Sequence, residues 1–353
     1  MKPTRTRPMH RRTGRLLILI ALLLVLLSTA TNASAQVCGS LTLGTQAEVD
    51  AVSCSSVTGT LLINGANITD LSPLSSVTSV GGDLLIGFNP VLTNLDGLAG
   101  ITSVGGGLFI FDNPALTNLD GLGGITSVGG ALNIQVNAVL TNVNGLGGIT
   151  SVSGNLFILE NPALTNLDGL AAVTSVGGDL RISSNPALTN LDGLAGITSV
   201  GGYLLIFSNT VLTNFYGLGG ITSVGGNLII GVNPVLTNLD GLAGITSVGG
   251  NLRIFSNPML TNLDGLAGIT SVGGYLDIDQ NTVLTEFCGL FPLLDAGGLV
   301  GTYTVIYNAT NPSEGQILAG GVCPVPEPDT ALMLVVGAGV LRLLQRARRR
   351  RER

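Results

Sequence analysis

A 24-residue repeat runs through the middle of this chain and limits the folds open to it more than any other feature. A fixed period of about 20 to 50 residues is typical of solenoids, propellers and repeat arrays. The periodicity inside one unit decides between these architectures. Leucine marks the repeat at Leu92, Leu116, Leu140, Leu164, Leu188, Leu212, Leu236, Leu260 and Leu284, and Ile68 extends the series backwards.

Each unit is predicted to contain one clear strand, a second short strand and tight corners. Leu108 and Ile110 alternate with variable positions, as in a strand with one buried face, and Ser127–Val128 is a candidate second strand. The following apolar residues recur every third position. That spacing would carry the stripe onto the opposite face of an α-helix, and glycines weaken a helix there. A compact 3₁₀-like turn is therefore predicted over Leu116, Leu119, Leu122 and Ile125.

Stacking of such units predicts a β-rich solenoid of about ten coils. A single coil cannot bury its apolar side, whereas coils stacked at the strand spacing of about 4.8 Å share one core of Leu, Ile and Val ladders. Ten coils would form a rod roughly 50 Å long at that spacing. The composition agrees, because 45% of the residues are hydrophobic but only 4% are aromatic, and stacked aliphatic side chains suit a narrow interior.

The repeat also resembles known families. The string Leu-x-Ile-x-x-Asn-Pro-x-Leu-x-x-Leu resembles leucine-rich repeats. With the preceding Val-Gly-Gly it is more similar to the receptor L-domain family, including the repeats of fungal cell-wall glycoproteins. The resemblance spans roughly residues 57–290 and implies a right-handed parallel β-solenoid, without any receptor or signalling role. Residues 181–215 also match residues 253–287 at a shift of 72, which indicates duplication of a three-coil block.

The N-terminal end carries an export pattern. Residues 1–15 are basic, Leu16–Leu27 is an unbroken apolar run, and small residues follow up to Ala35. This layout predicts a secretory signal peptide over residues 1–35 with cleavage before Gln36. An uncleaved membrane anchor is the alternative.

The C-terminal end, residues 325–353, has three parts. The motif Pro326, Glu327 and Pro328 comes first, an apolar stretch from Ala331 to Leu344 follows, and an arginine cluster ends the sequence. An apolar stretch with a basic tail predicts a transmembrane stop-transfer segment. The whole pattern resembles the PEP-CTERM sorting signal of Gram-negative bacteria. The resemblance implies transient anchoring in the inner membrane, cleavage by an exosortase-type protease, and delivery to the cell surface or extracellular matrix. Arg342 interrupts the apolar stretch, and a plain C-terminal anchor is the alternative.

Four cysteines flank the repeats in pairs. Export places them in an oxidising compartment, where disulfides persist. Four cysteines allow three pairings, and local pairing is favoured. Cys38–Cys54 would then staple an N-terminal cap over residues 36–60, and Cys288–Cys323 a C-terminal cap over residues 288–324, on either side of a repeat solenoid over residues 61–287.

Charge and residue types exclude several classes of function. Between Gln36 and Gly321 there are 18 acidic residues and two arginines, and this net charge of −16 excludes nucleic acid as a partner. The single histidine, His10, leaves with the signal peptide, and no lysine follows it, which excludes catalytic triads and histidine-rich metal sites. We therefore expect no enzyme. The carboxylate pair Asp277 and Asp279 keeps a polysaccharide-active β-solenoid lyase or hydrolase open as the alternative.

A ladder of asparagines follows the strands. A side-chain amide can satisfy backbone groups that would otherwise be unpaired at a buried corner, so a structural role is favoured. Its members are Asn89, Asn113, Asn137, Asn161, Asn185, Asn209, Asn233, Asn257 and Asn281.

A second column places aspartate before glycine in most coils. Asp-Gly is a turn signal, so turn capping is the favoured role. Carboxylates stacked about 5 Å apart could also recruit Ca²⁺, although the calcium-roll repeat pattern is missing and no other cofactor is expected. The column contains Asp96, Asp120, Asp168, Asp192, Asp240 and Asp264, with Asn144 in one coil.

The outward strand positions vary from coil to coil, while their inward neighbours do not. An exposed face with this many aromatic and aliphatic side chains is unusual for a soluble monomer. It predicts either a stripe that binds an extracellular polysaccharide or a surface protein, with the arginines clamping anionic groups, or a face covered by a loop or a second copy. The candidate residues are Phe109, Phe111, Phe157, Arg181, Phe207, Arg253 and Phe255. The sequence thus predicts an adhesion, binding or scaffolding protein of the bacterial envelope or biofilm matrix.

Overall fold

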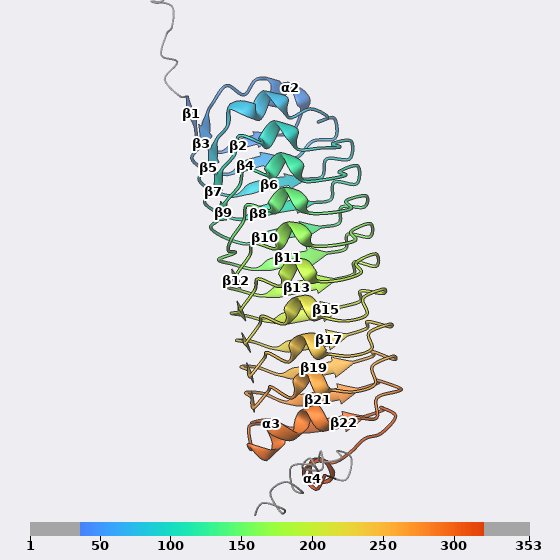
Figure 1. The fold of residues 1–353 in the computed structure, drawn as a ribbon. Coiled ribbons are helices and arrows are strands. Elements are labelled where there is room, and N and C mark those ends of the chain that lie inside the picture. The colour runs from blue at the N-terminus through green and yellow to red at the C-terminus, as the bar shows by residue number, and fades with distance from the viewer. Residues whose placement is uncertain (1–35, 321–353) are drawn as a thin grey trace, which may run out of the picture.

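The computed structural model describes residues 36–320, which form a parallel β-solenoid. Figure 1 shows the coils stacked one on another into a rod, from the N-terminal coils in blue to the C-terminal coils in orange. Strands of successive coils pair in parallel at a step of 24 residues through most of the rod, as Ile110 does with Ile134. The predicted β-rich solenoid is therefore confirmed. The predicted signal peptide and sorting signal lie outside the described residues.

One long sheet of 12 parallel strands forms one side of the rod. Its strand order follows the sequence, so each strand pairs with the strands of the coils before and after it. The predicted solenoid segment supplies the strands from β4 to β21, and the two predicted cap segments supply β2 and β22. The strands are β2 (Leu41–Leu43), β4 (Leu61–Ile63), β6 (Leu84–Gly87), β8 (Leu108–Phe111), β10 (Leu132–Gln135), β11 (Leu156–Leu159), β13 (Leu180–Ser183), β15 (Leu204–Phe207), β17 (Leu228–Gly231), β19 (Leu252–Phe255), β21 (Leu276–Asp279) and β22 (Tyr303–Ile306).

Two-residue strands form a second, narrower side, which confirms the predicted second strand. They make two five-stranded sheets. In the coil between these sheets, Val152 makes only isolated bridges, to Val128 and to Val176. The first sheet contains β1 (Val37–Cys38), β3 (Ser56–Val57), β5 (Ser79–Val80), β7 (Ser103–Val104) and β9 (Ser127–Val128), and the second contains β12 (Ser175–Val176), β14 (Ser199–Val200), β16 (Ser223–Val224), β18 (Ser247–Val248) and β20 (Ser271–Val272).

The interruption between these two sheets coincides with Ser153. From Gly81 to Gly273, Ser153 is the one residue at this corner position that is not glycine. At the glycines a Cβ atom would collide with the carbonyl oxygen of the preceding coil, as Gly129 would with Gly105 O. Ser153 carries that Cβ, so its corner has to shift. Among the described residues, the bond that Gly129 N donates to Val104 O, 3.0 Å long, has no counterpart from Ser153.

A column of 3₁₀ turns closes each coil, as the three-residue apolar spacing predicted (Figure 1). Glycine is needed at the centre of the turn because a Cβ atom on Gly121 would collide with Leu95 O of the coil before it. The turns are η1 (Ser72–Ser76), η2 (Asp96–Leu98), η3 (Asp120–Leu122), η4 (Asn144–Leu146), η5 (Asp168–Leu170), η6 (Asp192–Leu194), η7 (Tyr216–Leu218), η8 (Asp240–Leu242), η9 (Asp264–Leu266) and η10 (Cys288–Leu290).

Inward-facing aliphatic side chains form one continuous core along the rod. In one coil, Leu108, Ile110 and Leu116 are completely buried, and the same positions are buried in the coils on either side. Phe215 and Phe287 replace leucine at one core position, 72 residues apart, and are also completely buried. Each coil therefore depends on its neighbours for burial of its apolar side, as expected for a solenoid.

Caps cover both ends of this core. At the N-terminal end, α2 (Gln46–Asp50) begins with a capping box between Thr45 and Glu48, and the disulfide Cys38–Cys54 is formed as predicted. At the C-terminal end, α3 (Phe291–Asp295) and α4 (Glu314–Leu318) cover the last coil. Cys288 is disulfide-bonded, while its predicted partner Cys323 lies outside the described residues. Within residues 36–320, none of the helices has the length and apolar character needed to cross a bilayer.

Candidate binding face

The asparagine ladder lies at the corner that follows the large sheet. Asn113 is completely buried, and its Nδ2 donates to Ile86 O at 2.9 Å and to Phe111 O at 3.1 Å. Its Oδ1 accepts from the backbone N and the Nδ2 of Asn89, the ladder residue of the preceding coil. The same pattern repeats along the rod and continues to Asn308. The ladder therefore satisfies buried backbone groups and leaves little capacity for a ligand.

The residue before each ladder asparagine turns the chain in the left-handed region. Its φ lies between 53° and 57° in every coil from Phe88 to Tyr307. Such values are costly for residues other than glycine, and they persist only where the surroundings hold them. In this rod, the hydrogen bonds of the asparagine ladder fix the backbone at the position directly after each left-handed residue. The left-handed residues are Phe88, Asp112, Val136, Glu160, Ser184, Ser208, Val232, Ser256, Gln280 and Tyr307.

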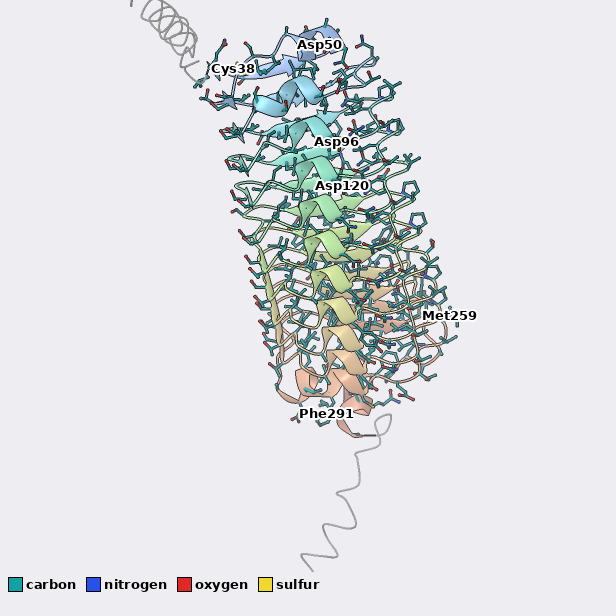
Figure 2. All side chains as sticks on the ribbon, turned by 45° about the horizontal axis from the view of Figure 1, so that its top comes forward. Cys38, Asp50, Asp96, Asp120, Met259 and Phe291 are labelled. Carbon is teal, nitrogen blue, oxygen red and sulfur yellow. A yellow bond between two sulfur atoms is a disulfide. The ribbon has the colours of Figure 1, made fainter. Side chains whose placement is uncertain are left out.

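The aspartate column lies on the row of 3₁₀ turns. Figure 2 shows Asp96 and Asp120 on successive turns. The prediction that these aspartates cap the turns was wrong, because Asn94 Oδ1 accepts from Asp96 N at 3.1 Å, and Asn118 does the same for Asp120. An asparagine two positions earlier thus makes the Asx turn, and the aspartate side chain is left exposed. Within residues 36–320, no three acidic, histidine or cysteine side chains gather into a metal-binding group.

The outer face of the large sheet, like the column of left-handed corner residues, is a part of the rod where coils differ in side-chain chemistry. We define the outer face by three columns of outward positions, which run from Asp83 to Tyr275, from Leu85 to Asp277 and from Gly87 to Asp279. The strand register places the predicted residues Phe109, Phe157, Arg181 and Arg253 in the second column, and Phe111, Phe207 and Phe255 in the third. All of these side chains are partly buried, because neighbouring members of the columns pack against one another.

Cluster A, near the middle of the outer face, is built around Arg181. Its guanidinium carbon lies 5.0 Å from the centre of the Phe157 ring and 5.9 Å from the centre of the Tyr203 ring. Its Nη2 donates to Oδ2 of Asp179, the residue directly before β13. Tyr203 is 42% exposed, so cluster A presents an aromatic residue to solvent.

Cluster B, three coils further along, is built around Arg253. Its Nε donates to Asp277 Oδ2 at 2.9 Å, and its Nη2 lies 4.0 Å from Asp279 Oδ1. Its guanidinium carbon lies 4.2 Å from the centre of the Phe255 ring, which is 6.1 Å from the Phe207 ring. Partial burial raises the pKa of Asp279, the charge of Asp277 raises it further, and Arg253 acts in the opposite direction. Cluster B therefore combines two carboxylates, one guanidinium and two rings.

The prediction did not include three residues of the outer face. Asp179, Tyr203 and Tyr275 belong to the first column of the outer face, whereas the predicted residues all belong to the second and third columns. The signal was present, because Asp179 and Tyr203 precede their strands by a single residue. Following the outward alternation to the residue before each strand would have included them.

Two shallow depressions lie elsewhere on the rod. One follows the narrow side from Ser56 to Ser153, and the other lies between Glu160 and Thr210 at the corner after the large sheet. Asp277 and Asp279 line neither depression. The carboxylate pair thus lies outside both depressions.

The chain matches no protein-family model and no curated protein.

Proposed function

We propose that this protein is an exported, non-enzymatic repeat protein of the bacterial surface or extracellular matrix, which binds its partner through the outer face and acts in adhesion or scaffolding. The observation that carries this proposal is the contrast between columns. Inward Leu, Ile and Val positions, corner glycines and ladder asparagines repeat with few changes, whereas the outer face carries a different set of side chains in each coil. Structural needs alone would repeat on every coil, so the varied face is where recognition belongs.

The proposed location follows from the two ends of the sequence. The N-terminal pattern would direct export, and the Pro326-Glu327-Pro328 motif with its apolar stretch would hold the chain in the inner membrane until an exosortase-type protease releases it. The partner would then be an extracellular polysaccharide or a surface protein. The excess of carboxylates over arginines argues against nucleic acid.

Intact-mass measurement of the form found in the cell envelope or culture medium tests the proposed route. We expect a mass that begins at Gln36 and ends near the Pro-Glu-Pro motif. Replacing Glu327 with Ala should leave the chain attached to the membrane with its arginine cluster intact. Recovery of the full 353-residue chain from the cytoplasm would contradict export.

Retention on the outer surface tests the proposed binding. Purified protein added to cells that lack it should be retained on the cell surface. The double variant Phe157→Ser, Phe255→Ser should be retained in a smaller amount. Equal retention of this variant and of a Tyr216→Ser control, which alters an exposed ring on the 3₁₀ row, would contradict a role for the outer face.

A polysaccharide-active enzyme is the second candidate, and the raised pKa of Asp279 beside Asp277 favours it. A protonated carboxyl next to an ionised one is the pairing that glycoside hydrolysis uses. Incubation of the purified protein with a glycan panel, with and without Ca²⁺, separates the candidates. New reducing ends or unsaturated products that disappear in Asp279→Asn would support the enzyme, whereas retention without turnover supports the binding protein.

A further inference from the structure

Three polar side-chain atoms of the outer face have no hydrogen-bond partner. They are Asn133 Oδ1, Arg181 Nε and Asp279 Oδ1, and among the described residues they are the side-chain atoms that are both shielded from solvent and unpaired. All three belong to the second and third columns of the outer face. Shielded polar atoms are normally paired. Among solvent-shielded side-chain atoms of the described residues, unused hydrogen-bonding capacity is therefore concentrated on one face.

The unused capacity is mixed in kind. Arg181 Nε is a donor, whereas Asn133 Oδ1 and Asp279 Oδ1 are acceptors. A hydroxyl group donates and accepts, so a ligand rich in hydroxyls can meet all three atoms. A carboxylate or sulfate group can only accept hydrogen bonds. It could accept one from Arg181 Nε, but it has no hydrogen to donate to Asn133 Oδ1 or Asp279 Oδ1.

Charge on the face also disfavours an anionic ligand. Arg181 is paired with Asp179, and Arg253 with Asp277 and more distantly with Asp279. Within residues 36–320 these two arginines are the only basic side chains. The expectation that they clamp anionic groups therefore conflicts with their environment, since each guanidinium already has a carboxylate partner.

Aromatic side chains supply the apolar half of the interaction. Tyr203 and Tyr275 are 42% and 41% exposed, and they occupy equivalent positions three coils apart. Sugar rings have apolar faces and hydroxyl edges, and aromatic rings with a polar tip suit both. Coils rise by about 4.8 Å each, which is close to the length of one sugar unit in an extended chain.

We propose that the outer face binds an uncharged, extended polysaccharide that lies along the axis of the rod and crosses cluster A and cluster B. Sugar rings pack on Tyr203, Phe255 and their neighbours, and hydroxyls reach the unpaired atoms of Asn133, Arg181 and Asp279 as these side chains turn outward. The inference rests on the proposed function, because it names the ligand of the same face.

Calorimetric titration of the full-length protein, purified in detergent, tests the inference. The probes are a soluble β-glucan, a galactomannan and the anionic polygalacturonate. We expect binding of at least one neutral polysaccharide, with an affinity that changes little at raised salt. Tyr203→Ser and Phe255→Ser should each weaken it by about tenfold, as loss of an interface ring does. Tyr216→Ser, a matched change of an exposed tyrosine on the 3₁₀ row, should bind like the wild type.

Three results would overturn the inference. One is a preference for polygalacturonate that salt abolishes. Another is equal weakening by Tyr203→Ser and Tyr216→Ser in variants with wild-type circular dichroism. The third is that no neutral polysaccharide binds, while the double variant Phe157→Ser, Phe255→Ser still shows reduced surface retention. In that case the outer face binds a protein, and the proposed function stands without this ligand.

Discussion

Single residues that depart from the repeat show which forces shape each coil. Ser153 places a Cβ where the neighbouring coils have none, and the narrow side is interrupted there. Asp279 places a carboxyl beside Asp277 on a partly buried strand, and its pKa rises. At Ser153 the same corner position of the neighbouring coils is glycine, so the local effect can be assigned to one side chain, whereas at Asp279 burial and the charges of Asp277 and Arg253 act together.

Ser153→Gly should increase stability. The substitution removes the colliding Cβ and allows the missing backbone bonds on the narrow side to form, and each such bond contributes about 1 kcal/mol. The entropy cost of glycine, about 0.5 to 1 kcal/mol, offsets part of this gain. We expect a higher midpoint of thermal unfolding by circular dichroism. Ser151→Gly in the same coil brings the entropy cost of glycine without removing a colliding Cβ atom, so it should lower the midpoint of thermal unfolding. Equal effects of the two changes would contradict the assignment.

Asp279 should make stability depend on pH. Its pKa in the folded protein lies above the ordinary value of 3.8, so the folded protein binds this proton more readily than the unfolded chain does. The free energy of unfolding should therefore fall as pH rises from about 4 through the raised pKa. Denaturant unfolding at pH values between about 3 and 7 should show this trend in the wild type and lose it in Asp279→Asn. Asp277→Asn, which removes one cause of the shift, should reduce the trend.

At the scale of elements, the corner after the large sheet is the most demanding part of each coil. It combines a left-handed residue with a buried asparagine at the next position. The 3₁₀ row is simpler, because Asx turns and close-packed glycines define it. The corner should accordingly be the more sensitive of the two to substitution.

Asn137→Ala should destabilise the rod by about 3 kcal/mol or more. The change leaves Ile110 O and Gln135 O without their donor and Asn113 N without its acceptor, and each buried unpaired group costs about 1 to 3 kcal/mol. Asn133→Ala, on the outer face of the same coil, removes an amide whose Oδ1 is unpaired and should be close to neutral. Denaturant unfolding measures both. Similar losses in the two variants would show that the ladder is not the source of the difference.

At the scale of the molecule, stability is shared between neighbouring coils rather than pooled in one globular core. Each coil buries its apolar residues against the coils before and after it, and the two caps end the series. In such arrays the free energy is approximately a sum of coil terms and nearest-neighbour terms. Damage at one end should therefore spread only a short distance.

Loss of the Cys38–Cys54 disulfide tests this locality. The bond joins residues 16 positions apart, and closing a loop of that size contributes about 3 kcal/mol. In Cys54→Ser, hydrogen exchange should become faster within residues 36–60, while amides of β13 and β15 keep wild-type rates. Faster exchange along the whole rod would contradict nearest-neighbour coupling.

The sequence alone predicted the coil, its two strand sides, the 3₁₀ turns and the N-terminal disulfide, because repetition multiplies weak local signals. It misassigned the turn cap to aspartate, because Asp96 and Asn94 are both good turn formers and only the hydrogen-bond geometry separates them. It also missed Tyr203 and Asp179, because these residues lie one position before their strands, and only positions within the strands were considered. The carboxylate partners of Arg181 and Arg253 depend on side-chain rotamers, which no periodic pattern encodes.

The asparagine ladder gives the rod a direction. In each link the backbone N of one ladder residue donates to the side chain of the next coil, from Asn89 through Asn281 to Asn308. Every interior coil thus offers an asparagine Oδ1 to the coil before it and a backbone N–H to the coil after it, so any interior coil can follow any other. Copying whole coils within the gene can lengthen the protein without redesigning its ends, and the 72-residue internal match is the mark such copying would leave. The length of the rod then becomes a property that evolution can adjust in whole coils, independently of the side chains on the outer face.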